Sequence, residues 1–223
     1  MRLKLASILI LGLFPLSPLM ADSPNKYRHD EHKGFDIKVA DLGSGIYELR
    51  TDRSGNVGLS IGSDGVFMID TQMEHLVELI DNTQKKLSNN QDVDLILNTH
   101  FHRDHVRGNA YFKRKDAIIM AHPNVRKYLK SPKAITALGR VAPSITENYF
   151  PTVNITADTS INMNGQTIEL YHSPNAHTDS DIFVRFKEAN VIHAGDLLFS
   201  GRFPFIDIDN GGSVNGYIEG LKM

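Results

Sequence analysis

Three imidazoles and a carboxylate lie within six positions of the segment THFHRDHVRGN, at residues 99–109: His100, His102, Asp104 and His105. Protonated imidazoles repel one another, so this crowding is unfavourable unless a cation lies among them. The segment offers little to a core, and we expect an irregular loop with no helix. The spacing predicts a metal site rather than a polar loop that is rich in histidine by chance.

The run VDLILN at residues 93–98 precedes this segment and is typical of a buried strand. Residues that follow a strand alternate between two sides, so we expect His100 and His102 to point one way and Phe101 to face the interior. Two neutral imidazoles form half of a tetrahedral zinc shell. Asp104 and His105 follow closely enough to reach a second ion beside the first.

Two other segments repeat the order of strand, turn and polar side chain. His177 lies in the segment HSPNAHTDSD between two expected strands, and Asp196 follows a glycine in HAGDLLF. Both are candidate metal ligands. Asp70 ends the strand-like run VFMID. It is a candidate for holding a metal ligand in place by a hydrogen bond, and the alternative is that it is only a turn residue at the end of the strand.

Three more polar side chains lie near these segments. Arg202, in GRFPFIDIDNGG, is a candidate for holding a substrate carboxylate, although a surface arginine fits the pattern equally well. His193 is expected to point into a sheet and His122 to begin a helix, both in structural roles.

Short apolar runs separated by glycine and aspartate turns alternate with helical patterns along the chain. The expected helices are 74–87, 124–130 and one that begins near Ser213, a good N-cap, and continues to Met223. Residues 131–153 contain three prolines and are expected to be irregular. The pattern favours an α/β layered domain with its site on strand-end loops. The expected strands are 35–39, 46–50, 57–61, 66–70, 93–98, 117–121, 167–172, 181–186 and 191–195.

The composition limits the class of protein. The chain has 223 residues, of which 41% are hydrophobic and 22% charged, enough for one sizeable domain. Its formal net charge is −2 and it has no basic stripe, so nucleic acid is not an expected partner. It contains no cysteine, so its metal ligands must be His, Asp, Glu or backbone groups.

The N-terminus is typical of a secretory signal peptide. The positive start MRLK precedes an apolar run and a proline-containing stretch that ends at Ala21, where cleavage is expected. A membrane anchor, the alternative, is too short and is broken by prolines. We therefore expect a periplasmic or secreted protein with no membrane attachment after cleavage. The expected divisions are residues 1–21 as signal peptide, 22–34 as flexible leader and 35–223 as the domain.

Together, the separate motifs resemble the metallo-β-lactamase superfamily. The motif His-x-His-x-Asp-His at residues 100–105, the distant His177 in AHTDSD and the Gly-Asp pair that ends at Asp196 occur in the family's order. The resemblance extends from about Phe35 to the C-terminus. It implies an αββα sandwich and a hydrolase that acts on a small-molecule substrate.

The resemblance also implies two adjacent zinc ions, with iron and manganese as alternatives. The imidazoles around the first ion would be those of His100, His102 and His177. Asp104 and His105 would hold the second ion, and Asp196 would bridge both. Asp70 matches the family's early aspartate, which supports the site.

Such a pair of ions about 3.5–4 Å apart would lower the pKa of a shared water from ~15.7 towards neutrality. Hydroxide would then form without a side-chain base, and Asp104 would orient it and later pass a proton to the leaving group. The predicted reaction is hydrolysis of an ester, thioester, lactone or lactam.

The sequence departs from the family pattern at the second metal. Family members supply one more histidine from a downstream Pro-Gly-His-Gly loop, whereas this sequence ends at GYIEGLKM. We expect either a C-terminally incomplete domain, lacking the last strand and loop, or a second site that is short of one ligand. The second case would suit a non-catalytic or mononuclear metal-binding protein, which is the main alternative.

The subgroup is partly defined by the ligand types. Lactamases that bind the second metal through cysteine are excluded, since the chain has none. A bridging Asp196 is similar to glyoxalase II-type thioesterases and lactonases. A metallo-β-lactamase of unassigned class is another alternative, and a nuclease of the same superfamily is disfavoured by the acidic charge.

Overall fold

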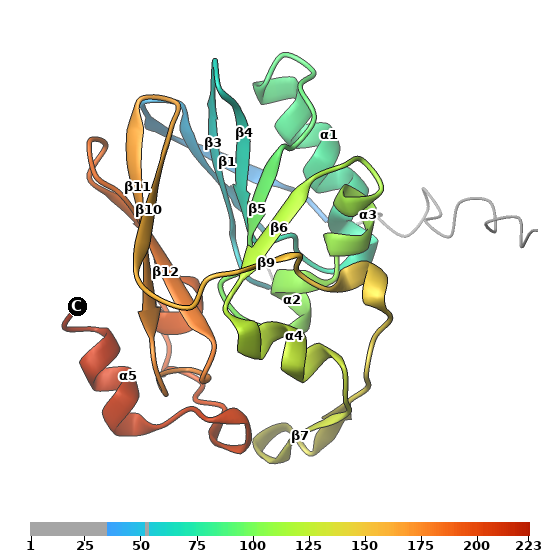
Figure 1. The fold of residues 1–223 in the computed structure, drawn as a ribbon, viewed down its shortest axis with the longest axis vertical. Helices are drawn as coiled ribbons and strands as arrows, with labels where there is room; N and C mark the ends of the chain where they lie inside the picture. Colours follow the sequence, from blue (N-terminus) through green and yellow to red (C-terminus); the bar gives the residue numbers. More distant parts are fainter. Residues whose placement is uncertain (1–34, 52–53) are drawn as a thin grey trace, which may run out of the picture.

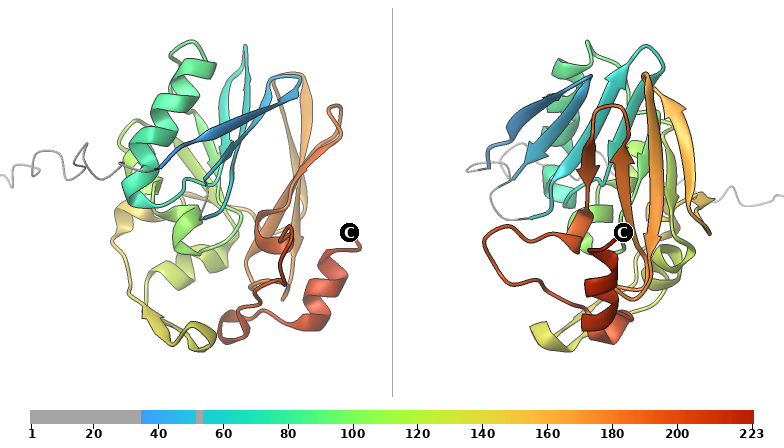
Figure 2. Two further views of the ribbon diagram at one scale, coloured as in Figure 1. Left: turned by 180° about the vertical axis from the view of Figure 1, so that it is seen from behind. Right: turned by 90° about the vertical axis from the view of Figure 1, so that its left-hand side faces the viewer.

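Two β-sheets face each other, with helices on their outer sides (Figures 1 and 2). The computed structural model describes residues 35–51 and 54–223. The expected signal peptide and leader lie outside the described residues. Within the described ranges, no helix combines the length and apolar character needed to span a bilayer.

The first sheet has seven strands in the order β1-β2-β3-β4-β5-β6-β9. Its first four strands are antiparallel neighbours, and the pairs from β4 onward are parallel. The strands are β1 (Lys38–Gly43), β2 (Ile46–Arg50), β3 (Val57–Gly62), β4 (Gly65–Ile69), β5 (Leu95–Leu97), β6 (Ile118–Ala121) and β9 (Val153–Asn154).

The second sheet has four antiparallel strands in the order β10-β11-β12-β13. These are β10 (Thr159–Met163), β11 (Gln166–Ser173), β12 (Asp181–Phe186) and β13 (Val191–His193). A separate hairpin pairs β7 (Lys133–Ile135) with β8 (Arg140–Ala142).

Strand β4 shows how the layers are held together. Val66 and Met68 pack on the helix side, against residues of α1, whereas Phe67 and Ile69 face the second sheet. All four side chains are fully buried. A strand buried on both faces needs a continuous apolar run, which is what VFMI supplies. The helices are α1 (Val77–Leu87), α2 (Arg103–Val106), α3 (Asn109–Lys113), α4 (Pro123–Leu129) and α5 (Val214–Gly220).

The structure confirms the α/β sandwich and most of the expected strands, with differences at element ends. The strand expected at 35–39 is shifted along the chain to Lys38–Gly43 (β1). The turn through Gly43 and Gly45, both with positive φ, fixes the pairing of β1 with β2 at this position. The helix expected at 74–87 begins as a 3-10 turn, Glu74–Leu76. The last helix has Ser213 as its N-cap, as predicted, but ends at Gly220 rather than continuing to Met223.

The prediction that the histidine segment has no room for a helix was wrong. Helix α2 is a single turn, in which the amide of Arg107 donates to the carbonyl of Arg103. His105 and Val106 are both buried, and Val106 packs with Phe101 in a small core cluster. Val106, the apolar residue after the polar run, packs one side of the turn against this cluster, while Arg103 stays exposed.

Two more elements were missed. Residues 131–153 were expected to be irregular but include the β7–β8 hairpin. Strand β10 was not expected either, because most of its residues are exposed and its sequence is polar. The Asn164-Gly165 pair, with positive φ at both positions, forms the turn to β11 and was the signal for this hairpin.

Candidate metal centre

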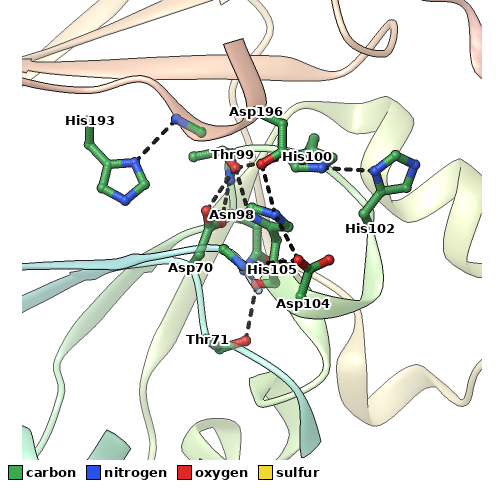
Figure 3. Close-up of polar contacts among 12 residues, drawn as sticks. Asp70, Thr71, Asn98, Thr99, His100, His102, Asp104, His105, His193 and Asp196 are labelled. Atoms are coloured by element: carbon green, nitrogen blue, oxygen red, sulfur yellow. Dashed lines mark hydrogen bonds and ion pairs between the residues drawn. The ribbon is translucent and has the colours of Figure 1, made fainter. Parts of the chain in front are cut away.

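The candidate ligands meet at one edge of the sandwich, where strand ends from both sheets converge (Figure 3). Asp70 follows β4, the histidine segment follows β5, and Asp196 follows β13 by three residues. The amide of Ile182 donates to the carbonyl of Thr99 at 2.8 Å, which joins the start of β12 to the histidine segment. Residues far apart in sequence are thereby placed around one point.

Three imidazole nitrogens form a small triangle. Nε2 of His100 lies 3.1 Å from Nδ1 of His102, and Nε2 of His177 lies 2.9 Å from the same atom. The third side, between Nε2 of His177 and Nε2 of His100, is 3.2 Å. Ligands about 2.0–2.1 Å from a tetrahedral zinc ion lie roughly 3.3 Å apart, so the triangle has the dimensions of one face of a zinc shell.

The other nitrogen of each ring has its own partner. Nε2 of His102 donates to Oδ2 of Asp207 at 2.8 Å, and Nδ1 of His177 donates to the carbonyl of Phe205 at 2.8 Å. Nδ1 of His100 lies 3.1 Å from Oγ1 of Thr99. Hydrogens on these outer nitrogens leave the three inner nitrogens with free lone pairs, as metal ligation requires.

Burial keeps the rings of His100 and His177 neutral. It lowers the pKa of His177 to about 4, with a further contribution from neighbouring His102. Burial, together with the adjacent imidazoles, holds the pKa of His100 well below its usual value. Because a cation competes with protons for these nitrogens, low pKa values favour cation binding at neutral pH.

A second group of ligand atoms adjoins the triangle. Nε2 of His105 is buried and has no hydrogen-bond partner in the described part of the chain, although Oδ1 of Asp196 lies 3.3 Å away and Oδ2 of Asp104 3.7 Å away. The other oxygen of Asp196 lies 3.5 Å from Nε2 of His177. The Asp196 carboxylate therefore faces both groups, as a bridging ligand would.

The carboxylates of this second group favour a positive charge among them. Burial disfavours a charged His105, but the nearby carboxylates, led by that of Asp70, outweigh it and hold the pKa of His105 well above its usual value. Burial also opposes ionisation of Asp196, yet the adjacent His105 holds the pKa of Asp196 below its usual range. A divalent cation placed here could take over the role of that proton.

Asp70 lies directly behind His105, in the supporting position expected from the sequence. It is fully buried, and its carboxylate accepts hydrogen bonds from the amide and hydroxyl of Thr99 at 2.7 and 2.8 Å. Nδ1 of His105 lies 2.7 Å from Oδ2 of Asp70. Asp70 thereby fixes which nitrogen of His105 faces the site.

The potential ligands fall into two sets. The four that each offer one atom within 4.8 Å of all the others are His100, His102, His177 and Asp196. Asp104 and His105 adjoin this set. Oδ2 of Asp104 accepts a hydrogen bond from the amide of Gly55 at 3.0 Å. A side chain at Gly55 would collide with His105, since a Cβ there would lie 2.6 Å from its ring.

The other candidates lie apart from this cluster. The guanidinium of Arg202 lies 5.1 Å from the ring centroid of Phe199, in the wall of a groove that also contains His105 and Asp196. His122 caps α4, as expected, and its ring stacks on His172. His193 is half-buried and packs against β3, so close to Gly58 that a Cβ there would collide with its ring.

Asp207 is a site residue that the sequence did not reveal. It is 1% exposed, and its carboxylate also accepts from Nδ2 of Asn210 at 2.9 and 2.8 Å. It lies 105 positions from His102, and no motif marked it. Only its location in the segment after Asp196 could have suggested a role.

Replacing Asp207 by alanine is expected to weaken zinc binding by about 10–100-fold, because a carboxylate that orients a ligand imidazole commonly contributes that much. Competition with a chromophoric chelator measures the affinity. Asp209→Ala is the matched control, since Asp209 is an exposed neighbour that contacts the amide of Thr136 instead of a ligand. Equal affinities for the two variants would contradict the assigned role.

Comparisons with known proteins agree with the fold. The chain has the same fold as a metallo-beta-lactamase from Pontibacter korlensis, with a TM-score of 0.64, 18% identity and 84% of each chain covered. It also resembles FEZ-1 from Legionella gormanii (TM-score 0.63, 16% identity, 82% of this chain and 73% of that one). It is also similar to BJP-1 of Bradyrhizobium japonicum, a subclass B3 metallo-beta-lactamase (TM-score 0.61, 20% identity, 82% of this chain and 72% of that one). Residues 50–222 match the metallo-beta-lactamase superfamily as a sequence family, and the chain therefore belongs to that superfamily.

Proposed function

We propose that the protein is a zinc-dependent hydrolase that binds two metal ions and cleaves an ester, thioester, lactone or lactam. One observation carries the proposal: three imidazole nitrogens lie about 3 Å apart, and Nε2 of His105, which is buried and makes no hydrogen bond within the described residues, lies beside them across the Asp196 carboxylate. A buried ring nitrogen without a partner is costly unless a ligand satisfies it. The donor set of imidazoles and carboxylates suits zinc.

His100, His102 and His177 would hold the first ion, Asp104 and His105 the second, and Asp196 would contact both. When bound, such a pair of cations lowers the pKa of a water molecule and polarises the carbonyl that it attacks. The protein itself orients the ligand rings and excludes bulk water from them. Asp207, Thr99 and Asp70 fix the ligand rings, and burial keeps bulk water from most of them.

Asp104 has the position of a proton carrier. Its side chain is 31% exposed, whereas that of His105 is 1% exposed, so it faces the open side of the centre. The hydrogen bond from Gly55 fixes one carboxylate oxygen and leaves the other free to accept a hydrogen bond from water. We assign Asp104 to orient the attacking water and to return its proton to the leaving group.

Asp104→Asn tests this assignment. We expect the rate of hydrolysis to fall by about 10²–10⁴-fold, the usual contribution of a positioned proton carrier. The first zinc ion should be retained, since His100, His102 and His177 are unchanged, whereas the second ion, which Asp104 helps to hold, should bind more weakly. The substrates are nitrocefin, a thioester and a lactone, with zinc counted in the same samples.

The second candidate function is that of a mononuclear, non-catalytic metal-binding protein. The two candidates differ in whether a second ion binds at Nε2 of His105, which makes no hydrogen bond to any residue that the structure describes. Two equivalents of zinc per folded chain, with turnover of at least one acyl substrate, support the hydrolase. One equivalent and no turnover on any of the three substrates would favour the binding protein.

We also propose that the protein is exported and that its substrate is a small molecule. The proposal for export depends on the signal-like sequence of residues 1–21. N-terminal sequencing of the mature protein tests it, and a start at Asp22 is the expected result.

A further inference from the structure

Gln72 is a polar residue that lies fully buried beside the candidate metal centre. It follows Asp70 by two positions, just after the end of β4. Its backbone has a φ of 63°, in the left-handed region that glutamine rarely adopts. Such strain persists only where the surrounding contacts impose it, and it is concentrated at functional sites. The contacts of Gln72 therefore indicate what this conformation achieves.

The side-chain amide of Gln72 contacts the segment that precedes β3. Its Oε1 accepts hydrogen bonds from the hydroxyl of Ser54 and from the amide of Met73, each at 2.9 Å. Its Nε2 donates to the carbonyl of Gly55 and, at 3.3 Å, to the hydroxyl of Thr51. A buried amide with hydrogen bonds on both its donor and its acceptor side keeps these neighbours in one arrangement.

The backbone around Gln72 is bonded to the segment of helix α2, which carries Asp104 and His105. The amide of Thr71 donates to the carbonyl of His105 at 2.9 Å, and the Thr71 hydroxyl oxygen lies 3.1 Å from the same carbonyl (Figure 3). The amide of Gly108 donates to the carbonyl of Gln72 at 3.1 Å. Gln72 therefore has a fixed position relative to Asp104 and His105.

Gly55 connects the side chain of Gln72 to these candidate ligands. Its carbonyl accepts from Gln72, and its amide donates to Oδ2 of Asp104 at 3.0 Å. Its backbone also lies so close to His105 that a Cβ would be 2.8 Å from Nε2 of that ring. A displacement of Gly55 would release the Asp104 carboxylate and open the buried edge of His105 to water.

We propose that Gln72 is a positioning residue. Its side chain keeps the amide of Gly55 against Asp104 and thereby fixes the carboxylate in the orientation that proton transfer needs. The proton transfer itself rests on the proposed hydrolase function. The contact between Gln72 and Gly55 belongs to the chain alone, so it is present with or without bound metal.

Hydrogen exchange of the Gly55 amide in the metal-free protein, followed by NMR, measures this positioning directly. Asp104→Ala removes the acceptor and sets the exchange rate of an unbonded Gly55 amide. We expect exchange in Gln72→Met to be as fast as in Asp104→Ala, because methionine has a similar length but no amide group. Unchanged protection of Gly55 in Gln72→Met would overturn the proposal.

Gln84→Met is the matched control for loss of a buried amide. Gln84 is also fully buried, lies in the second half of α1, and donates from Nε2 to Oδ1 of Asp81 at 2.9 Å. Its replacement should destabilise the fold comparably and leave the Gly55 amide protected. Equally fast exchange of Gly55 in both methionine variants would show a general loosening of the fold and would overturn the proposal.

Gln72→Gly is a second variant that keeps the test decisive if Gln72→Met does not fold. Glycine adopts a positive φ without strain, so this variant removes the side chain and relieves the backbone together. The Gly55 amide should again lose its protection. Retained protection in a folded Gln72→Gly protein would contradict the assignment.

Kinetics at saturating zinc test the consequence for the reaction. Because Gln72 acts on the proton carrier and not on the substrate, we expect kcat to fall by about 10–100-fold in Gln72→Met and Gln72→Gly, with KM unchanged. Gln84→Met should keep both values. Loss of Gly55 protection with no change in kcat would overturn the role of Gln72 in the reaction.

The exchange measurement separates failure of this inference from failure of the hydrolase proposal. If the wild-type protein cleaves none of the acyl substrates, the hydrolase proposal fails. Loss of Gly55 protection in Gln72→Met, but not in Gln84→Met, would still support the positioning of Gly55 by Gln72.

Discussion

Replacing His177 by alanine is expected to reduce kcat/KM by at least about three orders of magnitude and to remove the first zinc ion. His177 contributes one corner of the imidazole triangle, and its Nε2 also lies 3.5 Å from Asp196. Losing this nitrogen leaves two imidazoles, half of a tetrahedral shell. Cation stabilisation of the transition state is worth several kcal/mol, and about 1.4 kcal/mol corresponds to a factor of ten in rate.

Zinc analysis and ester hydrolysis on the same sample measure both effects. His172→Ala is a matched control, because His172 is five positions upstream and stacks on His122 rather than on the triangle. The control should keep its zinc and its activity. Full zinc occupancy and normal turnover in His177→Ala would contradict the whole assignment of the first metal site.

Replacing Asp70 by alanine is expected to lower the free energy of unfolding by about 3 kcal/mol and to empty the second metal site. Its carboxylate is fully buried and is contacted by two groups of Thr99 and by Nδ1 of His105. Removing one partner from a buried, charged network commonly costs 3–5 kcal/mol, since the remaining groups lose their compensation. His105 would also lose the contact that orients it.

Urea unfolding of the metal-free protein measures the change in stability, and zinc counting measures the second effect. Asp36→Ala is the control, because Asp36 is exposed and should change the free energy of unfolding by less than about 0.5 kcal/mol. Asp70→Asn keeps the shape but removes the charge, so it should retain more stability than Asp70→Ala. Equal stability of Asp70→Ala and the control would refute the supporting role.

The residue patterns were sufficient to predict an α/β layered domain and to name the residues that cluster at the strand ends, and the resemblance to the superfamily implied the αββα sandwich. Strand and helix periodicities are local, so runs such as VFMID and VDLILN predicted β4 and β5 directly. The spacing of His100, His102, Asp104 and His105 is also local. The structure brings these residues together with His177 and Asp196, as the order of motifs suggested.

Element boundaries and polar edge strands were less predictable. Strand β10 has mostly exposed side chains, so no hydrophobic alternation marked it, and only the Asn164-Gly165 turn carried a signal. Helix α2 forms because Val106 reaches a small core of residues from other segments. That burial depends on neighbours that are distant in sequence.

The identities of the candidate ligands and their order were determined by the sequence, because each depends on residue type and short-range spacing, whereas the sandwich architecture was implied by the resemblance to the superfamily. Only the tertiary structure decided that Asp207 orients His102 and that the amide of Gly55 fixes Asp104. The physical reason is that these contacts join loops whose approach depends on how the two sheets pack, and no local pattern encodes that distance.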